Sequence, residues 1–377
     1  MNFQLSETHQ ALKSLSREFA QEVIAPGAQD WNRAHRFPSE VFLQMGGLGL
    51  CGPLVPERYG GSAIGMVGYV VAMEQIGQAD QSLAAGWNAH CTIGTLPILN
   101  YGSEEQKDRW LVPLARGEKL GAFALTEPSG GSDIKALETR IRFEDDWLVV
   151  NGRKAFISNA GTDISYGVVT LGKDGEGNFA SVVVPRGTDG YSLGAPYVKI
   201  GWHSLDTREQ IFDNVRLPRA NLLGDGRQGL RSFLASLDAG RISVAALSLS
   251  LAEAALTEAL AYSKQRHAFG ETISKFQAIQ FKLARMAASI EAARLVTYQA
   301  AWLYDEGKAY TKEAAIAKLL ASEAATYCAA EAVQIHGGYG YILDSKVARL
   351  YLDSKVLEIG EGTNEIQQLV IARQLGC

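Results

Sequence analysis

The stretch Trp147-Leu148-Val149-Val150-Asn151-Gly152-Arg153-Lys154-Ala155-Phe156-Ile157 is where helical patterning gives way to strands. An apolar run leads into Asn151-Gly152, the most common two-residue hairpin turn, and a second apolar run follows it. Farther along, a Gly-rich turn at 174–178 precedes the apolar segment 180–184. Because no helical segment separates these runs, the region predicts an antiparallel barrel or sandwich instead of βαβ units.

Helical spacing of apolar residues flanks this β region on both sides. Before it, a capping box at Ser103-Glu104-Glu105-Gln106 opens one helix, and three- and four-residue steps indicate another near the N-terminus. After it, one apolar stripe contains Phe276, Ile279, Leu283, Met286, Ile290 and Val296. We therefore predict an α+β protein with a helical domain over 1–117, a β domain over 118–225 and a second helical domain over 226–377, the helical parts packed together.

Composition restricts the class of protein. A chain of 377 residues, 47% hydrophobic and 20% charged, is long enough to bury a large core. A net charge of -5 does not suit a nucleic-acid binder, and the four cysteines and six histidines show no metal-binding spacing. The N-terminus lacks the features of a secretion signal, and polar residues interrupt the apolar stretch 244–256. We expect a cytoplasmic protein without a metal, a nucleic-acid partner or a membrane span.

Two Gly-rich segments could approach a ligand closely. Glu127-Pro128-Ser129-Gly130-Gly131-Ser132-Asp133 follows a strand-like run, and Ser132 adds a hydroxyl donor. It is not a Walker A loop, and the absence of GxGxxG before a helix excludes a Rossmann site. Gln334-Ile335-His336-Gly337-Gly338-Tyr339-Gly340-Tyr341 ends a predicted helix. Taken alone, the first segment is more often a simple turn and the second a helix C-cap.

Three charged segments could carry chemistry. Glu361 stands between Gly360 and Gly362, where a substrate could lie against the backbone and an apolar pocket would make the carboxylate a general base. Asp238-Ala239-Gly240-Arg241 is predicted to open a long helix, where an anion could meet Arg241, and Arg266 follows that helix. A solvated glutamate and surface ion pairs remain the ordinary alternatives.

The joint order of these segments resembles the acyl-CoA dehydrogenase family over about residues 5–375. The motifs that carry the resemblance are Thr126-Glu127-Pro128 with Gly131-Ser132-Asp133, Phe156-Ile157-Ser158-Asn159, Arg266-x-x-Phe269-Gly270 with Gln277, Gln334-Ile335-x-Gly337-Gly338 and Glu361-Gly362-Thr363. The resemblance implies a C-terminal four-helix bundle, bound FAD, a homotetramer and an acyl-thioester substrate. It implies α,β-desaturation of that substrate, with electrons passed to electron-transferring flavoprotein.

The family pattern also assigns roles to individual positions. Glu361 matches the catalytic base; one subgroup places its base at the position of Gly240 instead, and this chain has glycine there. The positions that match FAD contacts are Phe123, Leu125, Thr126, Gly131, Ser132, Phe156, Ile157, Ser158, Arg266, Phe269, Gln277, Gln334, Ile335, Gly337, Gly338, Thr363 and Glu365. The positions that match substrate contacts are Ser132, Asp238, Arg241 and Gly362.

Two departures from the family pattern bear on the substrate and the cofactor. Gly360 stands where many relatives carry Tyr, so we expect a wider pocket for a branched, cyclic or otherwise bulky acyl group. Phe156 stands where Trp is frequent, which would change stacking on the flavin. Two alternatives stay open: a member of the family that acts on a carrier-protein-bound acyl or aminoacyl thioester or uses O₂, and a non-catalytic protein built on this scaffold.

Overall fold

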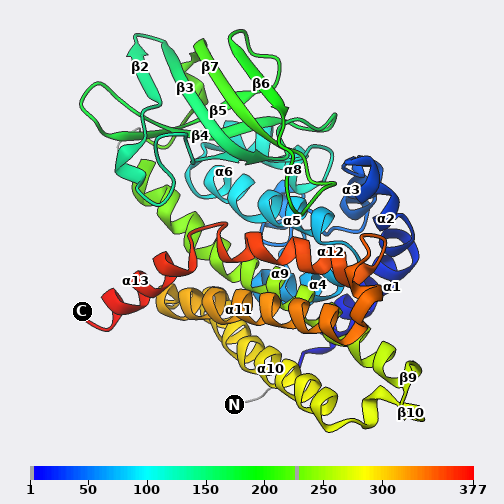
Figure 1. The fold of residues 1–377 in the computed structure, drawn as a ribbon. Helices are drawn as coiled ribbons and strands as arrows, with labels where there is room; N and C mark the ends of the chain where they lie inside the picture. The colour runs from blue at the N-terminus through cyan, green and yellow to red at the C-terminus, as the bar shows by residue number, and fades with distance from the viewer. Residues whose placement is uncertain (1–3, 226–228) are drawn as a thin grey trace.

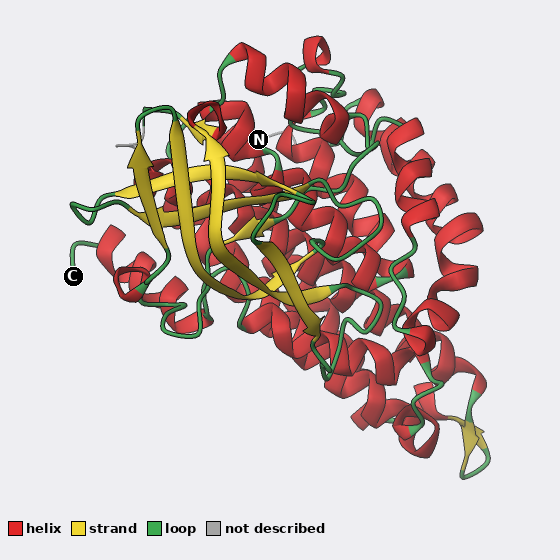
Figure 2. Ribbon diagram, turned by 90° about the horizontal axis from the view of Figure 1, so that it is seen from above, coloured by secondary structure: helices red, strands yellow, loops and turns green. Residues whose placement is uncertain are grey.

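The computed structural model describes residues 4–225 and 229–377. Figure 1 shows the sheet at one end of the molecule, above a body of helices drawn from both ends of the chain. Viewed from above, the curved strands lie over that helical body (Figure 2). The helix–sheet–helix order predicted from the sequence is therefore confirmed. The predicted boundaries at 117 and 225 remain predictions, and the start of the third domain, 226, lies outside the described residues.

The N-terminal helices pack around α4 and α5. Ser103 forms the predicted capping box with Gln106, which confirms that helix start. The α-helices are α1 (Glu7–Phe19), α2 (Ala25–Ala34), α3 (Ser39–Gly47), α4 (Gly65–Ala79), α5 (Gln81–Ala89), α6 (Leu96–Tyr101), α7 (Glu104–Gln106) and α8 (Val112–Ala115). Both α4 and α5 are buried along almost their whole length, so they form part of the core instead of covering it.

The central sheet is mixed, which corrects the purely antiparallel prediction. Its main path runs β6-β7-β3-β2-β4-β5-β8, and β4 pairs in parallel with both β1 and β2. The turn at 174–178 joins β4 to β5 as predicted. The strands are β1 (Phe123–Ala124), β2 (Arg140–Glu144), β3 (Trp147–Ser158), β4 (Gly167–Lys173), β5 (Phe179–Pro185), β6 (Tyr191–Pro196), β7 (Thr207–Pro218) and β8 (Leu222–Leu223).

The hairpin predicted at Asn151-Gly152 is wrong. Both residues lie inside β3, at an irregularity in its pairing with β7, and the hairpin that leads into β3 turns at 145–146 instead. Gly152 has φ 151°, and a Cβ there would lie 2.5 Å from Thr139 Oγ1. Close backbone approach at a β-bulge therefore explains this glycine, and local sequence did not distinguish a bulge from a turn.

The C-terminal part is dominated by three long helices. Its α-helices and strands are α9 (Gly229–Gln265), β9 (His267–Ala268), β10 (Glu271–Thr272), α10 (Gln277–Asp305), α11 (Thr311–His336), α12 (Lys346–Ser354) and α13 (Asn364–Gln374). Contrary to prediction, Asp238 and Arg241 lie well inside α9, so helix polarity at an N-terminus does not act on them. Met286 and Ile290 of the predicted stripe are buried.

Helix α9 packs against helices of both helical parts of the chain. It packs against α4 and α5 on one side and against α10 and α11 on the other. Its segment Ser236–Gln265 is long and apolar enough to pass a length-and-composition test for a membrane span, which the sequence analysis did not anticipate. Two thirds of its most apolar window is buried inside the protein, as in the core helix of a globular fold.

A buried ion pair holds the Gly-rich segment against the sheet. Lys154 Nζ on β3 lies 2.7 Å from Glu127 Oε1 and donates to the Leu125 carbonyl at 3.0 Å. Both side chains are almost fully buried. Burial lowers the pKa of Lys154 to about 8 although Glu127 opposes the shift. Glu127 also accepts the backbone N–H groups of Glu138 and Thr139, so one carboxylate fixes three chain segments.

Replacing Lys154 by Met should destabilise the fold. Lys154→Met leaves the Glu127 carboxylate buried without its cation, which costs about 3–5 kcal/mol when one partner of a buried pair is removed. The measurement is the free energy of unfolding in urea. The control is Arg153→Met, which removes an exposed arginine paired with the half-buried Glu209 and should cost under about 1 kcal/mol. Equal losses in the two variants would contradict a stabilising role for the buried pair.

Candidate active site

Glu361 lies in the loop before α13 with its carboxyl group turned into the protein. Its backbone has φ 51°, in the left-handed region. Asn88 Nδ2 on α5 donates to Oε1 at 3.4 Å, whereas Oε2 is buried and has no hydrogen-bond partner within the described part of the chain. Burial raises the pKa of Glu361 to about 7, although the positive charges of Lys318 and Arg241 and the Asn88 hydrogen bond lower it. This is the arrangement of a general base that works near neutral pH.

Gly240 on α9 makes room for this carboxylate. A Cβ built at Gly240 would lie 1.8 Å from Glu361 Oε2 and 3.0 Å from its carboxyl carbon. A side chain at position 240 would therefore force the Glu361 carboxylate to move, and glycine leaves the carboxylate its present place against α9. The structure thus brings together two positions, 240 and 361, that the sequence analysis paired only through a family resemblance.

Lys318 is a residue of the site that the sequence analysis missed. It is fully buried on α11, and its Nζ donates to Asn364 Oδ1 at 2.9 Å at the start of α13. Burial lowers its pKa to about 8, while Glu361, Glu358 and Glu365 raise it. A single lysine within the apolar, Ala-rich segment 314–332 was the available signal. Its ammonium group both fixes the loop that carries Glu361 and favours the ionised carboxylate.

Asp238 and Arg241 form a partly buried ion pair near Glu361 instead of a fully exposed surface pair. Asp238 Oδ1 accepts from Arg241, and Asp238 Oδ2 accepts from Thr311 Oγ1 at 2.8 Å. Arg241 Nε is buried without a partner in the residues that the structure describes. Because Arg241 lowers the pKa of Glu361, the pair belongs to the electrostatic surroundings of that carboxyl group.

The predicted residues of the β domain occupy two neighbouring segments. Ala155 N donates to the Thr126 carbonyl at 2.8 Å, which places 125–132 beside 156–158. Phe156 sits at a second bulge of β3 with φ 62°, and its ring is 65% exposed beside Tyr197. In the same segments, Phe123 and Ile157 are buried, Leu125, Thr126 and Ser158 are half-buried, and Gly131 and Ser132 are exposed.

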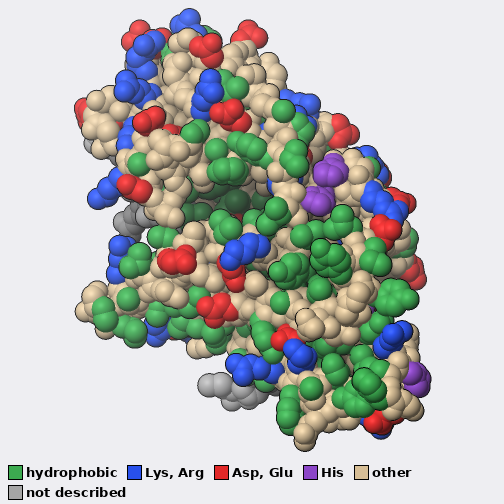
Figure 3. Space-filling model, in the orientation of Figure 1, with side chains coloured by type: hydrophobic (Ala, Val, Ile, Leu, Met, Phe, Trp, Pro, Cys, Tyr) green, Lys and Arg blue, Asp and Glu red, His purple; other side chains and the backbone are tan. Residues whose placement is uncertain are grey.

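The space-filling view shows a hollow lined by hydrophobic side chains between the sheet and the helices below it (Figure 3). This hollow separates the same two layers that Figure 1 shows, with the sheet above and α12 below. The deepest visible part is apolar and not charged. A ligand held there would contact elements from both layers.

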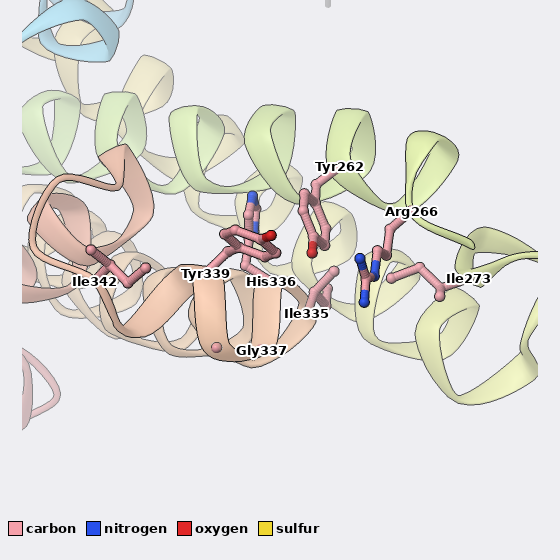
Figure 4. A pocket seen from close by; sticks show the side chains of 9 residues that line it. Tyr262, Arg266, Ile273, Ile335, His336, Gly337, Tyr339 and Ile342 are labelled. Carbon is pink, nitrogen blue, oxygen red and sulfur yellow. The ribbon is translucent and has the colours of Figure 1, made fainter. Parts of the chain in front are cut away.

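A pocket of about 560 Å³ lies where α9 ends beside the end of α11. Figure 4 shows Tyr262 on α9 and Arg266 just after its end, on the side of the pocket that faces Ile335, His336 and Tyr339. Arg266, Ile335, Gly337 and Gly338 were predicted site residues, whereas Tyr262, Ile273, His336, Tyr339 and Ile342 were not. The Tyr262 and His336 rings stack with centroids 4.2 Å apart, so aromatic and guanidinium surfaces face one pocket.

Three predicted residues of this region do not line that pocket. Phe269 is 98% exposed with φ 51°, and Gln277 and Gln334 are exposed. A smaller pocket of about 300 Å³ contains Thr363 and Glu365 together with Lys355 and Glu358. Gly362, predicted to contact substrate, follows Glu361 directly, and its carbonyl accepts from Gln367 Nε2 at 2.8 Å. Within one chain, the predicted positions therefore form separate groups.

Family models match nearly the whole chain. The N-terminal domain of acyl-CoA dehydrogenase matches residues 6–118, the middle domain 122–215 and the C-terminal domain 227–376. Among curated relatives, the Bacillus subtilis protein named "Probable acyl-CoA dehydrogenase YngJ" is 46% identical over 100% of both chains. The mitochondrial short-chain specific acyl-CoA dehydrogenase of Rattus norvegicus is 41% identical over 99% of this chain and 91% of its own. A 3-(aryl)acrylate reductase of Clostridium sporogenes is 40% identical over 98% of this chain and 99% of its own.

Solved structures agree with these matches. Butyryl-CoA dehydrogenase from Megasphaera elsdenii superposes with a TM-score of 0.97 at 38% identity over 100% of both chains. A chain in the structure described as electron transferring flavoprotein of Acidaminococcus fermentans superposes with a TM-score of 0.97 at 39% sequence identity. The match covers 100% of this chain and 99% of that one. A Bacillus anthracis acyl-CoA dehydrogenase complexed with FAD superposes with a TM-score of 0.94 at 32% sequence identity. The match covers 98% of this chain and 68% of that one. The sequence matches and the shared fold together place this chain in the acyl-CoA dehydrogenase family of flavin-dependent oxidoreductases.

Proposed function

We propose that this chain catalyses the α,β-dehydrogenation of an acyl-CoA thioester, with Glu361 as the base that takes the α-proton. The observation that carries the proposal is the Glu361 carboxyl group, buried with Oε2 unpartnered among the described residues and lodged in space that Gly240 leaves open. Its pKa of about 7 lets the carboxylate accept a proton at neutral pH and release it afterwards.

The residues present fit FAD. An exposed Phe156 ring beside the half-buried Thr126 could contact the flavin, and Gly131 has only Thr126 Cγ2, at 3.6 Å, near an added Cβ. Arg266 and the backbone of Gly337 and Gly338 line a pocket that suits a phosphate-bearing ligand. Bound FAD would supply the acceptor for the hydride that leaves the substrate β-carbon. The FAD complex of a Bacillus anthracis relative supports this assignment.

The mechanism assigns a proton transfer to this chain. Glu361 Oε2 takes the proton from the α-carbon, and the electron pair of that C–H bond forms the new double bond as hydride leaves the β-carbon, giving the trans-2-enoyl thioester. Lys318 and Arg241 favour the ionised Glu361 before the step. The Glu361 backbone N–H would donate to the thioester oxygen and so acidify the α-carbon. Substrate held between base and acceptor gains the advantage of orientation.

Electron-transferring flavoprotein is the proposed electron acceptor. The match to a chain in the Acidaminococcus fermentans electron transferring flavoprotein structure supports this partner. We also propose that the protein acts as a homotetramer, since the FAD-matching groups lie apart within one chain and Phe269 and Tyr341 are largely exposed. A cytoplasmic location is proposed on the scattered cysteines of the sequence alone.

The acyl group is proposed to be branched, cyclic or aromatic. A Cβ at Gly360 would meet only the Val356 carbonyl oxygen, at 3.4 Å, so this position leaves space beside the base. The similarity to a 3-(aryl)acrylate reductase supports a bulky acyl group, whereas the short-chain and butyryl-CoA relatives favour a small one. The substrate panel described below separates these two possibilities.

Replacing Glu361 by Gln should abolish turnover. Glu361→Gln removes the base but keeps its size, and loss of general-base catalysis should lower kcat by about 10²–10⁴-fold. The measurement is anaerobic bleaching of the flavin absorbance by short, branched and aromatic acyl-CoAs. The wild-type rate should rise with pH through about 7, because the carboxyl group must lose its proton before it can act. Bleaching that survives in the variant would place the base elsewhere, and no bleaching of wild type by any CoA ester would favour a carrier-protein substrate.

Gly240→Ala should impair catalysis without unfolding the protein. The added methyl group must displace the Glu361 carboxylate, and a shift of about 1 Å can cost about 10²-fold in rate. The measurement is kcat together with the flavin content of the purified protein. Gly47→Ala is the matched control, since that helical glycine has nothing within 4 Å of an added Cβ. Wild-type kcat in Gly240→Ala would contradict the placement of the carboxylate.

Gly360→Tyr should select against bulky substrates. The ring would fill the space beside the base and lower kcat/KM for branched and aromatic acyl-CoAs at least about tenfold relative to butyryl-CoA. The measurement is kcat/KM over a panel of acyl-CoAs for wild type and variant. A wild-type enzyme that strictly prefers straight butyryl-CoA would contradict the proposed acyl class.

A further inference from the structure

One side-chain amide contacts the Glu361 carboxylate. Asn88 Nδ2 donates to Glu361 Oε1, and among the side chains that the structure describes, those of residues 4–225 and 236–377, no other makes a hydrogen bond with either carboxyl oxygen. Asn88 is 3% exposed and lies on α5, far in sequence from the loop that it contacts. The two carboxyl oxygens are therefore unequal: Oε1 accepts a hydrogen bond, and Oε2 accepts none from the described side chains.

Tyr69 on α4 determines which way this amide points. Its hydroxyl donates to Asn88 Oδ1 at 2.8 Å, so the acceptor end of the amide is occupied and the NH₂ end is turned toward Glu361. Tyr69 is fully buried and packs against Trp87, with ring centroids 5.0 Å apart. Thr92 Oγ1 donates to the Asn88 backbone carbonyl at 2.8 Å, so the backbone of that turn is held as well.

The groups that face Glu361 come from four helices. Tyr69 lies on α4, Asn88 on α5, Arg241 on α9 and Lys318 on α11. The two cations act on Glu361 through their charge, whereas Asn88 contacts it directly. A hydrogen bond is directional, so the Asn88 contact distinguishes one carboxyl oxygen from the other.

We propose that Asn88, held by Tyr69, is a positioning residue that tethers Oε1 of Glu361 and leaves Oε2 as the oxygen that takes the α-proton. This inference rests on the proposed function of Glu361. The neutral amide donor stabilises the ionised carboxylate and restricts its rotation. Asn88 therefore acts on both the protonation of Glu361 and the orientation of its carboxylate.

The test uses size-matched variants of the flavin-loaded enzyme. Asn88→Leu removes the donor, and Tyr69→Phe removes the hydroxyl that orients it. The matched control is Gln81→Leu, which removes another buried amide of α5, one that donates to Ser250 Oγ at 2.9 Å and to the Gly77 carbonyl at 2.7 Å. We measure kcat and KM over pH, and titrate Glu361 directly by the infrared carboxyl stretch that is absent in Glu361→Gln.

We expect Asn88→Leu to lower kcat about tenfold with KM changed less than about threefold. Without the donor, the pKa of Glu361 should rise, so both the acid limb of the kcat profile and the infrared titration should move to higher pH. Tyr69→Phe should cause a smaller change in the same direction, and the double variant should be no worse than Asn88→Leu. Gln81→Leu should leave both pH curves in place.

Two results would overturn the inference. One is a Glu361 infrared titration that is unchanged in Asn88→Leu; the other is a double variant whose losses are the sum of the two single losses. Because the infrared titration does not require turnover, it tests the positioning role of Asn88 separately from the proposed function of Glu361. An inactive Glu361→Gln with wild-type behaviour of Asn88→Leu refutes only the positioning role, whereas an active Glu361→Gln refutes the proposed function.

Discussion

The site depends on one steric constraint: the Glu361 carboxylate occupies space that any side chain at position 240 would fill. Gly240 belongs to α9, the helix that packs against both helical parts of the protein, so the constraint connects the core to the loop before α13. Glycine inside a buried helix costs about 0.5–1 kcal/mol relative to alanine. In return, the glycine leaves room for the Glu361 carboxylate against α9.

Burial and charge oppose each other at this carboxyl group. Desolvation raises the pKa of Glu361, and Lys318 and Arg241 limit the rise. Neither cation is free: Lys318 is held by Asn364 and Arg241 by Asp238. Fixed groups therefore keep the pKa of Glu361 at about 7. The protonation of this base depends on how α9, α11 and the loop before α13 pack together.

The β domain also contains a buried pair of opposite charges. The buried pair of Lys154 and Glu127 fixes the Gly-rich segment at its base, and the bulge two residues later turns Phe156 outward. Two irregular features of one strand, at Gly152 and Phe156, thus serve different ends: close packing against Thr139 and presentation of an aromatic ring.

The sequence by itself determined the order of helical and β regions, the capping box at Ser103 and the family, because periodicity, caps and motif order are local properties of the chain. Tertiary structure decided the rest. Asn151-Gly152 became a bulge because Thr139 lies against it, and Asp238-Arg241 became a helix interior because α9 begins earlier. Lys318 and Asn88 came to the site from helices far from Glu361 in sequence. Local patterns do not encode which distant residues meet, and the chemistry of a buried carboxylate is set by those neighbours.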